Sequence, residues 1–66
     1  MERNYEIIVA SGVITLTRFP ASGASAVEAF ENAIEMGQYF DSNGVVQVIA
    51  RNMETNVILK FEASRA

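Results

Sequence analysis

The sequence predicts an α+β fold in which one helix packs on one face of a four-stranded antiparallel sheet. Two runs of β-type residues precede a capped amphipathic segment, and two further β-type runs follow it, over residues 5–10, 13–19, 26–40, 45–51 and 56–62. Because these elements use nearly all of the 66 residues, we expect a single ββαββ domain over residues 1–66. A right-handed crossover from the second strand to the third favours the strand order 2-1-3-4.

The first two β runs are expected to form a hairpin closed by Ser11-Gly12. Glycine supplies the positive φ that a two-residue turn needs. This turn sets Val9 opposite Ile14, Ile7 opposite Leu16 and Tyr5 opposite Arg18 on the helix side of the sheet, so the apolar pairs gather on that side. Pro20 is expected to end the second strand, because proline cannot donate a hydrogen bond to a ladder.

The helix is expected over residues 26–40. Ser25-Ala26-Val27-Glu28 has the pattern of a capping box, in which the serine side chain accepts a hydrogen bond from the amide of residue 28. Apolar and small residues recur at helical spacing and form one stripe, made of Ala26, Val27, Phe30, Ala33, Ile34, Gly37 and Phe40. Ala33 and Gly37 are small where the helix must approach the sheet. The turn residues 41–44 are expected to end the helix.

The last two β runs are expected to form a second hairpin with a loop centred on Met53-Glu54. Alternate residues then point to the helix side, in the pairs Ala50 with Val57, Val48 with Leu59 and Val46 with Phe61. Residues 63–66 are expected to be loose.

The composition narrows the chemistry that the chain can support. The sequence contains no cysteine and no histidine, which removes disulfides, thiolate nucleophiles and the commonest general base and metal ligand. The net charge of −3 argues against simple electrostatic binding of nucleic acid. The apolar runs are too short to span a membrane, and residues 1–5 lack an apolar signal core. We therefore expect a cytoplasmic protein that is not an enzyme and holds no cofactor.

The sheet face that points away from the helix is the first candidate binding surface. We expect it to have an apolar centre and a polar rim, made of Ile8, Val13, Ile49, Arg51, Ile58 and Lys60. Such a patch fits a protein partner or a second copy of the chain, and dimerisation would add stability to a short chain. The alternative interpretation is an ordinary solvated sheet face, on which scattered β-branched residues are common.

The outer face of the helix is the second candidate surface. It carries the acidic residues Glu28, Glu31 and Glu35, with Tyr39 beside them. Such a face can meet a basic protein groove by imitating nucleic-acid phosphates, and the alternative interpretation is a solvated helix face. The chain offers no Asp-rich loop or second ligand set to complete a metal site, so we expect no bound metal.

The segment Ala24-Ser25-Ala26-Val27-Glu28-Ala29-Phe30 follows a hairpin, and it is followed by Ala33 and a closing strand pair. In this order of elements the chain resembles small phage-encoded anti-CRISPR proteins, and its acidic helix edge is similar to that of a small phage inhibitor of bacterial RNA polymerase. Phe19-Pro20 and Glu28-Ala29 also resemble a small antitoxin domain with a partial RNase H fold.

The first resemblance implies a non-enzymatic inhibitor that acts in the cytoplasm of a bacterial host. Such a protein would bind a bacterial protein or nucleoprotein complex and block its nucleic-acid site. Two alternatives stay open at this point. One is a homodimeric regulatory or structural module, and the other is a small nucleic-acid-binding module that uses Arg51 and Lys60.

Overall fold

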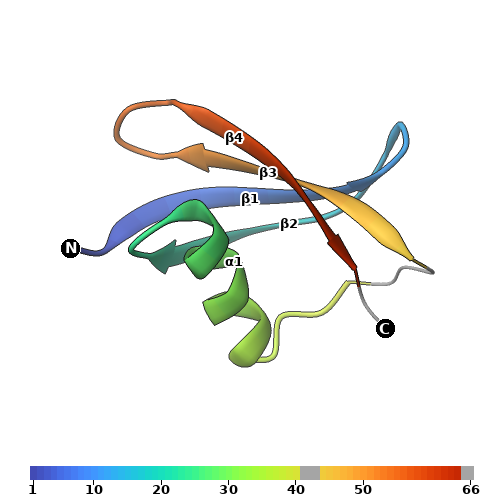
Figure 1. The fold of residues 1–66 in the computed structure, drawn as a ribbon, viewed down its shortest axis with the longest axis horizontal. Coiled ribbons are helices and arrows are strands. Elements are labelled where there is room, and N and C mark those ends of the chain that lie inside the picture. Colours follow the sequence, from blue (N-terminus) through green and yellow to red (C-terminus); the bar gives the residue numbers. More distant parts are fainter. Residues whose placement is uncertain (41–43, 65–66) are drawn as a thin grey trace.

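A computed structural model describes residues 1–40 and 44–64 of the chain. Its elements follow in the order β1 (Arg3–Ser11), β2 (Ile14–Gly23), α1 (Ala26–Glu35), β3 (Val45–Asn52) and β4 (Ile58–Ser64) (Figure 1). The four strands form one antiparallel sheet in the order β2-β1-β3-β4. The predicted ββαββ fold and its strand order are therefore confirmed.

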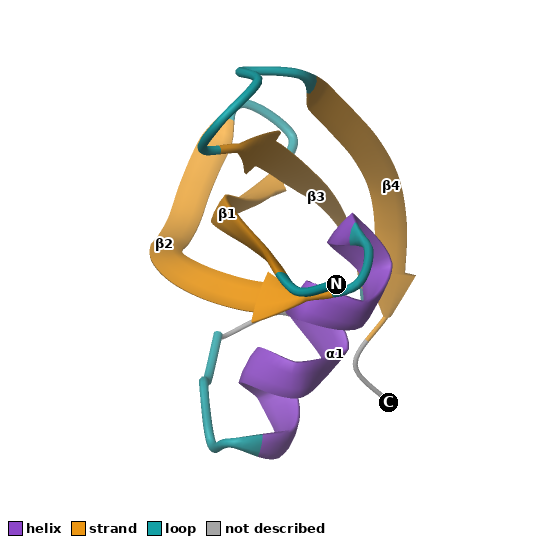
Figure 2. Ribbon diagram, turned by 90° about the vertical axis from the view of Figure 1, so that its left-hand side faces the viewer, coloured by secondary structure: helices purple, strands orange, loops and turns teal. Residues whose placement is uncertain are grey.

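The helix α1 packs on one face of the sheet, which we call the front face, and it lies mainly against β2 and β1 (Figures 1 and 2). The core fills the space between them with Tyr5, Ile7, Val9, Phe19, Ala26, Ala29, Phe30, Phe40, Val46, Val48 and Ala50. Phe30 is central, because its ring lies 6.1 Å from that of Phe40 and 5.8 Å from that of Phe61. The second contact is edge-on, an arrangement that aromatic pairs favour.

The turn of the first hairpin uses the expected glycine in a different position. Gly12 has a φ of 60°, but it is the first residue of a Gly12-Val13 loop whose flanking pair is Ser11 with Ile14. Glycine at this first loop position is typical of a type II′ turn. Val13 therefore lies at the hairpin tip, where its side chain is fully exposed.

The register of this hairpin is the main error of the sequence prediction. Val9 pairs with Thr17 and Ala10 with Thr15, so Leu16 is the extra residue of a β-bulge in β2. The predicted pairs are replaced by Val9 with Thr17, Ile7 with Phe19 and Tyr5 with Ala21. The shift brings Phe19 into the core, while Leu16 still packs against the core. Arg18 moves to the opposite side of the sheet, where it pairs with Ile8.

Pro20 does not end the second strand, because β2 continues to Gly23 and Pro20 pairs with Glu6 inside it. Proline is tolerated there because β2 is an edge strand, with only one side in a ladder. The continuation places Gly23 under the helix. A Cβ on Gly23 would lie 2.6 Å from the backbone nitrogen of Ala29, so the close approach of helix and sheet depends on this glycine.

The helix begins as predicted and ends earlier than predicted. The amide of Glu28 donates to the Oγ of Ser25 at 3.2 Å, as expected for the capping serine. At the other end, Gly37 has a φ of 100°, and the amides of Gly37 and Gln38 donate to the carbonyls of Ile34 and Ala33 at 3.1 and 3.0 Å.

This pair of hydrogen bonds is a Schellman motif that ends α1 at Glu35. Gly37 is therefore a helix cap and not a contact with the sheet. The predicted stop over residues 41–44 falls largely on residues 41–43, which lie outside the described residues. Of the predicted apolar stripe, Val27 is exposed. Phe40 reaches the core from beyond the helix.

The second hairpin is shifted by two residues from the predicted register. The observed pairs on the front face are Ala50 with Leu59, Val48 with Phe61 and Val46 with Ala63. The loop is displaced because the Oδ1 of Asn52 accepts hydrogen bonds from the amides of Glu54 and Thr55, at 2.9 and 3.1 Å. A shift of two keeps every side chain on its predicted face. Ala63 and Ser64 belong to β4 and are not loose, and residues 65–66 lie outside the described residues.

Candidate functional site

The face of the sheet opposite α1, which we call the back face, carries one row of side chains across all four strands. Ile8 and Ile49 lie opposite each other on the central strands β1 and β3. Arg18 on β2 flanks Ile8, and Lys60 on β4 flanks Ile49. This row therefore has an apolar centre and a cation at each end.

The next row along the back face contains a carboxylate that contacts one arginine in each row. Glu6 pairs with Arg51, and Ile58 follows Arg51 at the edge of the sheet. The Oε2 of Glu6 lies 3.0 Å from Nη2 of Arg18, and its Oε1 lies 3.3 Å from Nη2 of Arg51. The two rows together form what we call the back surface, made of Glu6, Ile8, Arg18, Ile49, Arg51, Ile58 and Lys60.

The two arginines favour the ionised form of Glu6. The hydrogen bond from Arg18, and after it the one from Arg51, hold the pKa of the Glu6 carboxyl below its ordinary value. The carboxylate therefore stays ionised further into the acidic range than an isolated glutamate does. The arrangement suits recognition, because a fixed anion orients two guanidinium groups. Arg51 is held further by Nη1, which donates to Oδ1 of Asn56 at 2.8 Å.

A shallow hollow of about 440 Å³ opens beside the ion pair of Glu6 and Arg18. Pro20 and Met53 line it, and so do Asn4 and Ser22, whose side chains are joined by a hydrogen bond of 2.8 Å from the Ser22 hydroxyl. The hollow gives one end of the back surface a concave shape.

Most of the predicted back-face residues do come together. Ile8, Ile49, Arg51, Ile58 and Lys60 occupy neighbouring positions in the two rows. Val13 does not join them, because it lies at the tip of the first hairpin.

The sequence prediction missed Arg18 as a member of this surface, because the predicted register placed it opposite Tyr5 on the helix side. One signal could have found it. The alternation of Phe19, Ala21 and Gly23 continues past Pro20, as it would in a longer strand with Arg18 on the other face.

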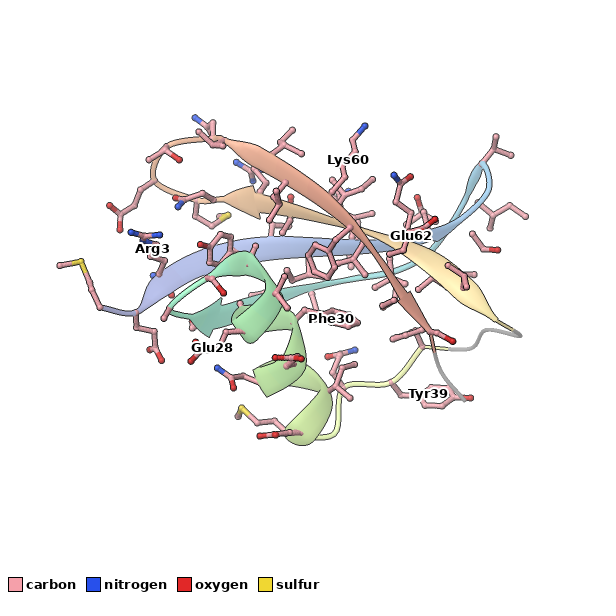
Figure 3. The ribbon with its side chains drawn as sticks, in the orientation of Figure 1. Arg3, Glu28, Phe30, Tyr39, Lys60 and Glu62 are labelled. Carbon is pink, nitrogen blue, oxygen red and sulfur yellow. The ribbon has the colours of Figure 1, made fainter. Side chains whose placement is uncertain are left out.

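The acidic helix face is present but shorter than predicted. Glu28, Glu31 and Glu35 are exposed on α1, which contains no lysine or arginine. Tyr39 follows the end of α1, so it does not continue this face, and Figure 3 shows it well apart from Glu28. The three glutamates and the cations of the back surface are therefore carried by separate layers of the molecule.

Metal binding and membrane spanning were considered for residues 1–40 and 44–64, which the structure describes. In this part of the chain, no three His, Cys, Asp or Glu side chains are grouped so that they could hold a metal ion. The helix found there is neither long enough nor apolar enough to pass through a membrane.

The chain matches no family model, no curated protein and no solved structure.

Proposed function

We propose that the protein is a non-enzymatic binding protein that docks its back surface on a bacterial protein or nucleoprotein complex and blocks the nucleic-acid site of that complex. The observation that carries this proposal is the row formed by Arg18, Ile8, Ile49 and Lys60 on the sheet face that α1 leaves uncovered. An apolar centre with a polar rim is the usual anatomy of a protein interface, and arginine is enriched in such interfaces.

The apolar part of the back surface supplies the driving force. Ile58 is 55% exposed, and Ile8 and Ile49 are the half-buried pair at the centre of the neighbouring row. At roughly 25 cal/mol for each Å² of apolar area, covering these side chains would contribute a few kcal/mol. Only part of this appears as affinity, because association has an entropic cost.

The charged part of the back surface supplies the specificity. Arg18 and Arg51 are already oriented by Glu6, so less conformational freedom is lost when a partner binds them. Arginine presents several donors in a fixed plane, which suits carboxylates and phosphates. A partner segment with acidic side chains beside apolar ones would fit this surface.

In this proposal the acidic helix face is the part of the protein that inhibits the partner. Glu28, Glu31 and Glu35 would occupy a basic groove that otherwise holds a nucleic acid. In the version that we favour, the partner is a CRISPR effector complex in the cytoplasm of a bacterial host, and the protein is a phage-encoded anti-CRISPR protein. The alternative partner in the same class is bacterial RNA polymerase.

The test is direct binding to purified complexes. Immobilised protein is exposed to CRISPR effector complexes and to bacterial RNA polymerase, and nucleic-acid binding by each complex is then measured with and without the protein. Ile58→Lys should weaken binding at least about tenfold. Val13→Lys is the matched control, because Val13 is fully exposed at the hairpin tip and lies outside the back surface.

Two outcomes would count against the proposal. Binding to neither complex would overturn it. Binding of free nucleic acid by the protein alone, lost at moderate salt or on changing Arg51 and Lys60, would instead support the nucleic-acid-binding module.

A further inference from the structure

The two edges of the sheet differ in their capacity to accept another strand. In β2, Pro20 lacks an amide donor and Leu16 forms a bulge, and both features hinder pairing at an edge. In β4, the pairing with β3 is regular over its whole length, and the strand contains no proline. Among the described residues, no element lies along the outer side of β4 (Figures 1 and 2).

The hydrogen-bond pattern identifies the backbone groups at this open edge. The amide of Asn52 donates to the carbonyl of Val57 at 2.9 Å, across the start of the β3–β4 ladder. In an antiparallel ladder, alternate residues direct both backbone groups to the same neighbour. Leu59, Phe61 and Ala63 therefore bond to β3. The outward-facing groups are those of Ile58, Lys60, Glu62 and Ser64.

We propose that β4 pairs with β4 of a second copy of the chain, antiparallel, about a twofold axis at Phe61. The two four-stranded sheets then form one continuous sheet, with α1 of each copy on the same side. When the strand pairs over its full length, Ile58 faces the partner's Ser64 and Lys60 faces the partner's Glu62. The outward backbone groups of both copies are satisfied in the same register.

The charges on β4 select this register over its neighbours. Lys60 and Glu62 lie on the same side of β4, the side away from α1 (Figure 3), and full-length pairing sets each against the opposite charge. A register that keeps the faces matched can change only in steps of two residues. One step places Lys60 against the partner's Lys60, and a step the other way places Glu62 against the partner's Glu62. Like charges directly opposite each other are destabilising.

The front face supports the same pairing. Phe61 would face the partner's Phe61 at a non-hydrogen-bonded position, where side chains across an antiparallel pair are closest. Next to this pair of phenylalanines, Leu59, which is 49% exposed, would face the partner's Ala63. On this side α1 lies mainly over β2 and β1, and it reaches β4 through the ring of Phe30 against that of Phe61. Dimerisation would thus cover apolar side chains of a chain that has no disulfide to stabilise it.

A charge swap tests the proposal through sedimentation equilibrium and light scattering. The wild-type chain is expected to be a dimer at high concentration. Lys60→Glu and Glu62→Lys should each raise the dimer dissociation constant roughly tenfold or more, because two attractive pairs become repulsive in each dimer. The double variant Lys60→Glu with Glu62→Lys restores opposite charges and should restore the dimer. Glu54→Lys is the control for a charge change in an exposed loop.

Cross-linking supplies a second measurement. The variant Leu59→Cys with Ala63→Cys should form disulfides between copies, because the chain has no native cysteine and positions 59 and 63 face each other only across the dimer. Within one chain these positions are roughly 13 Å apart, too far for a disulfide.

Three results would overturn the proposal. The first is a wild-type chain that stays monomeric at millimolar concentration. The second is a dimer that survives both single charge reversals, and the third is a dimer abolished by Ile49→Lys but not by Lys60→Glu, which would place the contact on the back surface. The pairing of β4 engages the back surface only at Ile58 and Lys60, and it leaves Ile8, Ile49 and Glu6 uncovered. Because the oligomeric state is measured without the bacterial complexes, each of these results is distinguishable from a failure of the proposed partner binding.

Discussion

At the scale of single residues, Glu6 connects the fold to the candidate site. Its carboxylate contacts Arg18 on one edge strand and Arg51 on the neighbouring central strand. Arg18 is exposed and Glu6 and Arg51 are only partly buried, so solvent screens these ion pairs and their effect on stability is small. Their main consequence is to fix where the two guanidinium groups lie, and that position is what a partner would recognise.

The pH dependence of stability is predicted from the lowered pKa of Glu6. Because the pKa in the folded state lies below the ordinary value of 4.5, the ionised carboxylate favours folding at neutral pH. This contribution is lost as the pH falls from the ordinary pKa through the lowered one. Urea titrations at neutral and acidic pH should therefore show a larger loss of stability for the wild type than for Glu6→Gln. Equal losses would contradict the coupling of Glu6 to the arginines.

The residues of the back surface were partly accessible from sequence alone. Ile8, Ile49 and Lys60 were assigned to the correct face because alternation along β1, β3 and β4 is unbroken. Arg18 was not, because the bulge at Leu16 breaks the alternation in β2. A bulge leaves no clear mark in a pattern of apolar residues, since the extra residue here also packs against the core.

At the scale of elements, the start of α1 was predictable and its end was not. Ser25 and Glu28 mark the start through local backbone chemistry, which a sequence shows directly. The end depends on Gly37, which fits both a helix cap and a small residue in an apolar stripe. Phe40 fits the same apolar stripe, because it lies at helical spacing from Gly37. In the structure Phe40 is in the core although it lies beyond the helix. Tertiary packing, and not helical spacing, brings it there.

The contact between α1 and β2 is predicted to depend on Gly23. Gly23→Ala would place a methyl group within 2.6 Å of the Ala29 nitrogen, and helix and strand must separate to admit it. We expect a loss of about 1–3 kcal/mol in the free energy of unfolding, measured by urea denaturation. Ala24→Ser, at the next position and exposed, is the control and should change stability little. A Gly23→Ala variant as stable as the wild type would contradict the close backbone contact.

At the scale of the whole molecule, the layered fold separates two kinds of charge. The outer layer, α1, carries Glu28, Glu31 and Glu35 with no basic residue, and the back face of the sheet carries Arg18, Arg51 and Lys60. One molecule can thus present an acidic surface and a mixed apolar and cationic surface in different directions. In a dimer joined through β4, the two back surfaces would lie on one side of the joined sheet and could bind two sites of a partner together.

The thermal stability of the whole molecule is predicted to depend on its concentration. If the folded chain pairs through β4 and the unfolded chain does not, mass action stabilises the folded state more strongly as the concentration rises. The midpoint of thermal unfolding should therefore rise with wild-type concentration, and it should be nearly constant for Lys60→Glu. Ile49→Lys should keep the concentration dependence even if its midpoint is lower, because Ile49 lies on the back surface and not at the β4 edge. Scanning calorimetry over a hundredfold range of concentration measures the unfolding midpoints of the wild type and the two variants. A wild-type midpoint that does not move over this range would show that the folded chain unfolds as a monomer.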